Sequence, residues 1–158
     1  MRELEADPEW VAKRDERERR RQERSRFYAA DEAELVAELR DLGYAVESVW
    51  DLVNNDPHPI LERVFVGPYQ SAYPLLVRHL RVAHVSRTRE GIIRALSVSD
   101  VDSATQSALL QELKNESNPE LRWTLANALQ ASLSSSEQAR HPEIALALRW
   151  PGPDSGAA

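Results

Sequence analysis

Residues 73–96 read YPLLVRHLRVAHVSRTREGIIRAL, and residues 106–129 read QSALLQELKNESNPELRWTLANAL. The two segments align without a gap at an offset of 33 residues. Identical residues stand at five aligned pairs: Leu76 with Leu109, Leu80 with Leu113, Arg89 with Arg122, Ala95 with Ala128 and Leu96 with Leu129. A repeat of this period is typical of stacked helix-turn-helix units, which cannot bury their apolar faces alone. The fold is therefore predicted to be all-α, with 73–96 and 106–129 as its clear repeats.

The second segment has a more specific pattern. Pro119-Glu120-Leu121-Arg122, followed by Ala126, Ala128 and Leu129, resembles the second helix of a HEAT repeat, and residues 88–96 are a poorer copy. The turn acid usual in that family is Glu116 in the second unit but Ala83 in the first. The resemblance covers about 60 of the 158 residues, or 31–133 if an atypical first unit is included. It implies a short right-handed α-α superhelix, similar to small bacterial HEAT-like proteins with a charged N-terminal helix.

The sequence before the repeats divides at about residue 30. Residues 1–30 are expected to form a charged helical arm, which begins after Asp7-Pro8-Glu9, a typical helix start. From Lys13 to Arg26 there is no apolar residue, so this helix has no face to bury and either projects or lies loosely along the body.

Residues 31–133 are expected to form the helical body. Apolar residues on one stripe predict a helix from residue 31 to its C-cap at Gly43, and shorter helices are predicted over 46–53 and 60–66. Residues 134–158 are expected to hold a loop at 134–136, a short helix that ends at Trp150, and a tail. Because no third full repeat follows, the exposed end of the last unit needs a cover, from residues 144–150 or from another chain.

Composition excludes several classes of protein. There is no cysteine, so disulfides and thiolate sites are excluded, and the cytoplasm is the expected location. No apolar run approaches the roughly 18 residues that a membrane span needs, and no signal peptide is evident. The net charge of −6 lies in the body, because residues 1–30 carry nine basic and eight acidic side chains. An acidic body disfavours general binding to nucleic acid.

No catalytic or metal site is predicted. None of the four histidines, His58, His79, His84 and His141, stands in a metal-ligand pattern, and no cofactor is implied. Nucleophile and phosphate-binding motifs are also missing, so the chain is not expected to be an enzyme. An enzyme with a cryptic site remains an alternative, which would need a desolvated carboxylate such as Glu90.

The repeat offset places polar residues on one surface. At about 100° per residue, Thr88, Ile92, Ala95 and Leu96 share the core face of one helix. In HEAT-like proteins the second helices line a concave binding face. The resemblance therefore implies a partner-binding strip that points away from the core: Arg87, Glu90, Arg94, Glu120, Trp123 and Asn127. Arg89 and Arg122 lie at the edge of the core stripe, where a hydrogen bond to a neighbouring turn is expected.

Trp123 has two interpretations. A large aromatic residue opposite the core is a typical anchor for a protein partner, but it could instead pack under the C-terminal segment near Trp150. The leading hypothesis is a non-catalytic protein-binding module: an adaptor, a regulatory protein or an immunity-type inhibitor. The alternative is a nucleic-acid-associated protein that contacts phosphates through the basic arm, Arg87 and Arg94. Neither the partner's identity nor the oligomeric state follows from the sequence.

Overall fold

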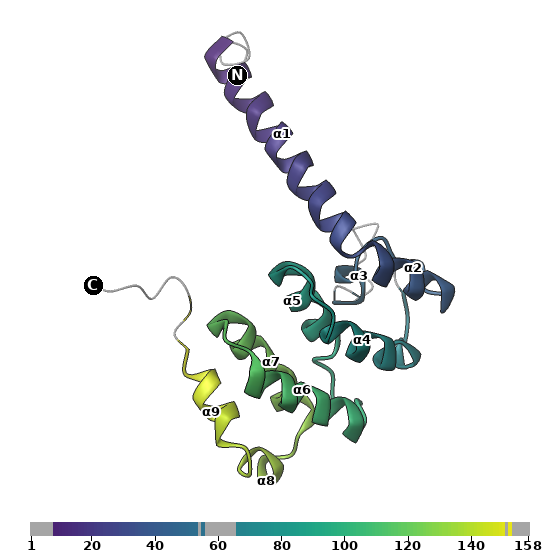
Figure 1. Cartoon of the computed structure of the whole chain (residues 1–158), viewed down its shortest axis with the longest axis vertical. Helices are drawn as coiled ribbons and strands as arrows, with labels where there is room; N and C mark the ends of the chain where they lie inside the picture. The colour runs from purple at the N-terminus through teal and green to yellow at the C-terminus, as the bar shows by residue number, and fades with distance from the viewer. Residues whose placement is uncertain (1–7, 54, 56–65, 151, 153–158) are drawn as a thin grey trace, which may run out of the picture.

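The computed structural model describes residues 8–53, 55, 66–150 and 152, and the regular structure in these ranges is helical throughout (Figure 1). The elements in chain order are α1 (Pro8–Asp31), α2 (Ala33–Asp41), α3 (Trp50–Val53), the 3₁₀ helix η2 (Gln70–Ala72), α4 (Tyr73–Leu80), α5 (Ser86–Ala95), α6 (Ser103–Asn115), α7 (Pro119–Ser132), α8 (Ser135–Gln138) and α9 (Pro142–Leu148). The prediction of an all-α fold is confirmed. The helix predicted over 60–66 lies outside the described residues, apart from Val66.

The two repeats form two helix pairs that lie side by side. Helix α4 packs against α5, and α6 packs against α7. Across the pairs, α4 contacts α6 and α5 contacts α7 (Figure 1). First helices thus neighbour first helices, and second helices neighbour second helices, which is the arrangement that the offset of 33 residues predicts.

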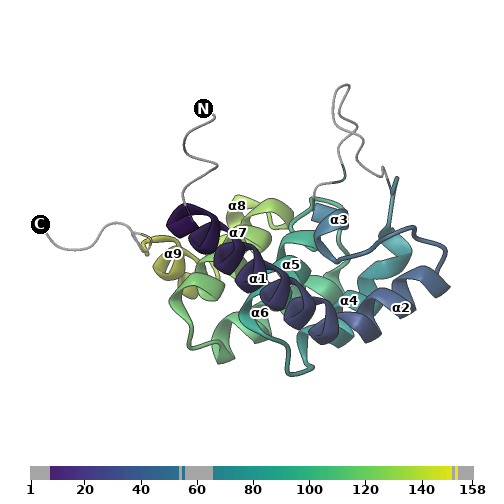
Figure 2. The same cartoon turned by 90° about the horizontal axis from the view of Figure 1, so that it is seen from above.

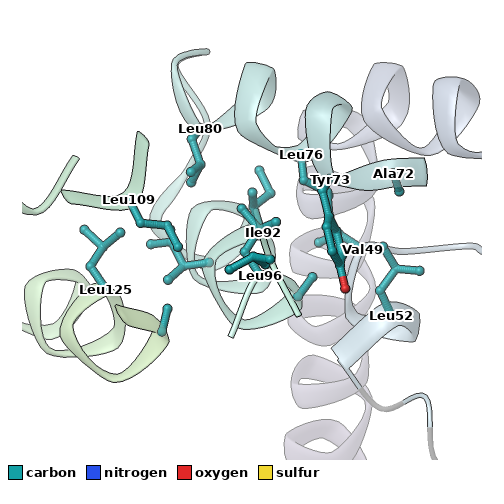
Figure 3. Close-up of a cluster of buried hydrophobic side chains, with 14 of the residues drawn as sticks. Val49, Leu52, Ala72, Tyr73, Leu76, Leu80, Ile92, Leu96, Leu109 and Leu125 are labelled. Carbon is teal, nitrogen blue, oxygen red and sulfur yellow. The ribbon is translucent and has the colours of Figure 1, made fainter. Parts of the chain in front are cut away.

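One apolar core runs through both pairs. Leu76, Leu109, Ile92 and Leu125 are fully buried, and the leucine and isoleucine side chains of successive helices meet along its length (Figure 3). At the α3 end the core continues through Val49 and Leu52, which are also shown in Figure 3. The predicted core face of α5 is confirmed, because the residues assigned to it are buried: Thr88, Ile92, Ala95 and Leu96.

The aligned arginines make equivalent hydrogen bonds. Arg89 donates from Nη1 to the carbonyl of Leu80 at 2.6 Å, and Arg122 donates from Nη1 to the carbonyl of Leu113 at 2.7 Å. Donors and acceptors are both related by the repeat offset. In each pair the second helix therefore satisfies a carbonyl that the end of the first helix leaves without an intrahelical partner.

Helix α1 projects from the body as an arm (Figure 1). None of its residues is buried, which agrees with the absence of apolar residues between Lys13 and Arg26. Its last turns contact α2 and α5, and seen from above it crosses over the body near α5 (Figure 2). Of the two arrangements left open by the sequence, the projecting one is observed.

Local hydrogen bonds explain where the predicted helices differ from the observed ones. The predicted helix over 46–53 is wrong in its first half, because the Glu32 carboxylate accepts from the backbone of Val49 and the Asp51 carboxylate accepts from Glu47 and Ser48. These bonds hold a turn, and α3 begins only at Trp50. The C-cap of α2 is Leu42 rather than the predicted Gly43, which follows it with φ of 95°, the left-handed conformation that commonly ends a helix.

The C-terminal segment covers the end of the second pair. Helix α9 packs on α7 and α6 and buries Ile144 and Ala147, so residues of this chain provide the cover that the last repeat needs. The loop predicted at 134–136 is wrong. Ser134 and Glu137 form a capping box there, and α8 begins at Ser135.

Candidate functional site

The predicted strip lies along α5 and α7, whose outer surfaces adjoin. Arg87 and Glu120 are exposed near the starts of the two helices, whereas Glu90, Arg94, Trp123 and Asn127 are half-buried. The structure thus brings the six residues onto neighbouring helices. Some of these side chains already bond within the protein and others do not. This difference determines which of them are available to a partner.

In the middle of the strip, two polar side chains are bonded within their own helices. Arg94 donates from Nε to Glu90 Oε1 at 2.7 Å, an ion pair between residues four apart. Asn127 donates from Nδ2 to the carbonyl of Trp123 at 2.8 Å. Glu90 is the carboxylate that an enzymatic interpretation would need as a desolvated group, and it has a cation beside it. The middle of the strip thus holds a neutral ion pair on α5 and a half-buried tryptophan, Trp123, on α7.

Arg87 lies between two aromatic rings. Its guanidinium carbon is 5.3 Å from the ring centre of Tyr28 on α1 and 5.2 Å from that of Trp50 on α3. Cation–π contacts of this length orient a guanidinium while leaving its N–H donors free for other acceptors. Arg87 therefore joins the arm to the body and remains exposed.

A hollow of about 490 Å³ opens where the arm meets the body. Arg21, Arg24 and Tyr28 of α1 line one side, and Arg87 of α5 lies at its edge. Glu32 also lines the hollow, but its carboxylate is occupied by the Ser48 hydroxyl at 3.1 Å and the Val49 N–H at 3.1 Å. Cationic side chains from two helices thus share one concave surface.

A partly buried chain of ionisable groups joins α1, α2 and α4. Asp31 Oδ2 lies 3.2 Å from His84 Nδ1, His84 Nε2 lies 3.0 Å from His79 Nδ1, and His79 Nε2 lies 3.5 Å from Glu38 Oε1. Burial above all, then the neighbouring His84 and Arg78, lowers the pKa of His79, while Glu34 opposes the shift. Asp31 also accepts from the backbone N–H of Val85, the N-cap residue of α5.

Sequence reasoning missed this chain of groups. Asp31 and His84 are 53 residues apart, and their meeting depends on how α1 packs against the turn before α5. The only local signal is the pair His79 and His84, five residues apart, which has the spacing of zinc-finger histidines but lacks the cysteine pair that accompanies them. At the Glu38 end, this chain of contacts continues in an ion pair with Arg78. The cluster therefore connects helices α1, α2 and α4 and is assigned a structural role.

A second cluster connects η2 and α4 to the loop after α5. Asp100 accepts from the Tyr73 hydroxyl at 2.8 Å and from Gln70 Nε2 at 2.8 Å, and these bonds lower the pKa of the Asp100 carboxyl. Tyr69 donates from its hydroxyl to the carbonyl of Ala95 at 2.8 Å. Burial, with a smaller effect from Asp100, raises the pKa of Tyr69 to about 12.

Between repeats, Arg89 has a further role. Its Nη2 lies 3.2 Å from Glu112 Oε2 and 3.0 Å from Glu116 Oε2, so one guanidinium binds two carboxylates of the following pair. Glu116 Oε1 also accepts from the Asn118 N–H at 2.9 Å. The expected hydrogen bond to a turn is observed for Arg122, which donates to the Glu116 carbonyl at 2.9 Å. Arg89 bonds instead to the helix-end carbonyl of Leu80, and its carboxylate partners link the two pairs.

Within the described ranges, no group of three or more carboxylate, histidine or cysteine side chains is placed to hold a metal ion. The same ranges contain no helix that is both long and apolar enough to cross a membrane.

The arm junction and the α5–α7 surface are two features that could contact another molecule. Comparison with known proteins finds no match to a protein-family model, to a curated protein or to a solved structure.

Proposed function

We propose that this chain is a non-catalytic protein-binding module, in which α5 and α7 present the binding face of a short right-handed α-α superhelix of the HEAT type. The observation that carries the proposal is the arrangement of the second helices. Helices α5 and α7 lie against each other, bury one face in a common core and leave the opposite face to a mixture of charged, amide and aromatic side chains.

The composition of this face suits a protein partner. Trp123 is half-buried, so part of its ring remains accessible beside the polar side chain of Asn127. Aromatic residues surrounded by polar groups are the usual anchors of protein interfaces. Glu90 and Arg94 neutralise each other, which keeps the centre of the face free of the net charge that a nucleic-acid surface requires. The proposal places the module in the cytoplasm.

The test is affinity capture with wild-type protein and with the double variant Trp123→Ala/Arg94→Glu. A protein that the wild type enriches from a lysate of the source cells should be lost with the double variant, while the helical content stays unchanged. The matched control is Leu146→Ala/Arg140→Glu, which makes the same kinds of change at exposed positions on α9 and after α8. Equal capture by wild type and Trp123→Ala/Arg94→Glu would refute the assignment of this face.

Binding to nucleic acid is the second candidate, and it is favoured by the hollow that Arg21, Arg24 and Arg87 share. The pairing of Arg94 with Glu90 removes one of the cations that this alternative relies on. A mobility-shift titration at low and moderate salt distinguishes the two functions. Phosphate contacts must weaken steeply as salt rises, whereas a complex held by an aromatic anchor depends on salt much less.

A further inference from the structure

The charges of α1 are sorted onto different faces of the helix. Residues at alternating spacings of four and three fall on one face of an α-helix. In α1 this series ends at Asp31, and the residues before it are all aromatic or arginine: Trp10, Arg14, Arg17, Arg21, Arg24 and Tyr28. These six residues are called the arginine stripe below. The acids Glu9, Glu16 and Glu23, seven residues apart, follow another line along the helix.

The arginines of the stripe have few acidic partners. Arg14 pairs with the adjacent Asp15 at 3.0 Å. Arg17, Arg21 and Arg24 have no ion pair with any carboxylate in the described ranges, although Arg17 donates from Nε to the carbonyl of Lys13. All four arginines are exposed.

Of the four basic residues of α1 off the stripe, three are in ion pairs, and Arg26 forms none with the residues that the structure describes. Arg19 and Arg20 both pair with Glu16, and Lys13 pairs with Glu9. Like charges three and four residues apart on a helix repel each other. An isolated arm would therefore be more stable with acids interleaved along the stripe, as they are elsewhere on α1. An arrangement that concentrates unpaired cations on one line favours an anionic partner on that side.

The stripe meets the body of the protein at the base of the arm. Its last residue, Tyr28, contacts Arg87 of α5, so the stripe runs outward from the hollow at the base of the arm. Arg87 extends the row of cations onto the start of α5, the first helix of the proposed binding face. From Arg14 to Arg24 the row is about 15 Å long, at about 1.5 Å of rise per residue.

We infer that the arginine stripe, together with Arg87, docks an acidic helix of the partner protein. Carboxylates three and four residues apart on an α-helix recur at the same intervals as the arginines of the stripe, so the two rows can pair along their length. Trp10 and Tyr28 lie at the two ends of the row, where they can contact apolar side chains that bound the acidic segment. The inference rests on the proposed function in one respect, that the occupant is a protein.

Charge on the remaining surfaces favours a helix over nucleic acid. A duplex that received the arm in a groove would bring phosphates close to several faces of α1, including the line of Glu9, Glu16 and Glu23. The body carries the net negative charge of the chain and lies at the base of the arm, where the stripe ends (Figure 1). A single acidic helix presents its charge to one side only and can turn an uncharged side to the body.

The test measures the fluorescence anisotropy of three labelled probes with the full chain. The first probe is a helical peptide with glutamates at alternating spacings of three and four, the second has glutamine at those positions, and the third is a single-stranded thymidine oligonucleotide. The stripe variant is Arg17→Gln/Arg21→Gln/Arg24→Gln. The matched control, Arg19→Gln/Arg20→Gln/Arg26→Gln, removes the same charge from the same helix outside the stripe. Circular dichroism checks that both variants keep α1 helical.

The glutamate peptide should bind the wild type and the control with similar Kd and bind the stripe variant about tenfold more weakly, since each exposed charge contact contributes modestly. The glutamine peptide should bind none of them. If both triple variants bind the glutamate peptide equally weakly, the effect depends only on the overall charge of α1, and the inference is wrong. If the oligonucleotide binds more tightly than the glutamate peptide and loses affinity with the stripe variant, the ligand of the stripe is nucleic acid and the inference is wrong.

The outcome is separable from that of the proposed function. If the stripe variant binds the glutamate peptide as the wild type does, while Trp123→Ala/Arg94→Glu still loses the captured protein, the docking of an acidic helix is wrong and the binding face on α5 and α7 stands. The opposite outcome is loss of peptide binding in the stripe variant with protein capture unchanged in Trp123→Ala/Arg94→Glu. In that case the docking of an acidic helix is supported, and the assignment of the binding face to α5 and α7 is wrong.

Discussion

His79 Nδ1 lies 3.0 Å from His84 Nε2, and the two imidazole rings stack with their centres 5.3 Å apart. Because a neutral imidazole has one N–H and one acceptor nitrogen, one ring of this pair must donate and the other accept. Protonation of both rings would oppose two N–H groups at this contact. The outer nitrogens of the pair face Asp31 and Glu38.

We expect the protein to lose stability as the pH falls from 7 to 5. Burial, together with His84 and Arg78, lowers the pKa of His79 in the folded chain, against the opposing effect of Glu34. The unfolded chain then binds a proton near pH 6.5, before the folded chain does, so the free energy of unfolding falls in this interval. Urea unfolding at a series of pH values measures the change.

The variant His79→Gln should flatten this dependence, since the group whose pKa is shifted is then absent. His141→Gln is the control, because the imidazole of His141 lies 3.6 Å from Glu143 and is much more exposed than that of His79. If His79→Gln unfolds with the same pH dependence as the wild type, the titration belongs to other groups.

Replacing Arg89 by alanine should destabilise the protein by about 2–3 kcal/mol. The substitution removes the donor to the Leu80 carbonyl and leaves the carboxylates of Glu112 and Glu116 close together without their shared cation. Arg94→Ala breaks a more exposed ion pair and should cost less than about 1 kcal/mol. Chemical denaturation of the two variants gives the comparison, and equal losses would mean that Arg89 does not connect the helix pairs.

Gly91→Ala should lower stability by about 1–3 kcal/mol, although alanine ordinarily favours helix. A Cβ atom at this position would lie 2.7 Å from Val49 Cγ1 and 2.9 Å from Trp50 Nε1. Helix α5 and the segment before α3 approach each other too closely for a methyl group, so one of them must move. Gly91→Ser should cost more than Gly91→Ala, and near-ultraviolet circular dichroism of Trp50 should change in both. An increase in stability would contradict the close packing of α3 on α5.

Leu76→Ala and Leu109→Ala should each cost about 2–5 kcal/mol, because both leucines are fully buried in one core. Since that core continues from one pair to the next, each variant should still unfold in a single transition. Thermal unfolding followed by circular dichroism and by tryptophan fluorescence tests this, and the two signals should coincide. Separate transitions would show that the pairs fold independently.

The internal repeat was sufficient to predict the helix pairs and their core. Because burial of a helix face depends on local spacing, aligning Leu76 with Leu109 and Ile92 with Leu125 identified residues that are indeed buried. Local motifs could have predicted more. Ser134 and Glu137 have the spacing of a capping box, so the start of α8 could have been predicted from the sequence. A loop was predicted there instead.

Contacts between distant segments required the tertiary structure. Arg87 is held between Tyr28 and Trp50, and His84 meets Asp31, only because α1 leaves the body beside the start of α5. Helical periodicity assigns a residue to a face of its own helix, but it does not specify which other helix that face meets. The sequence was therefore sufficient to predict that the arginines of α1 belong to a charged helical arm, but not which element their face meets. The packing of Tyr28 on Arg87 decides that their common face turns toward α5.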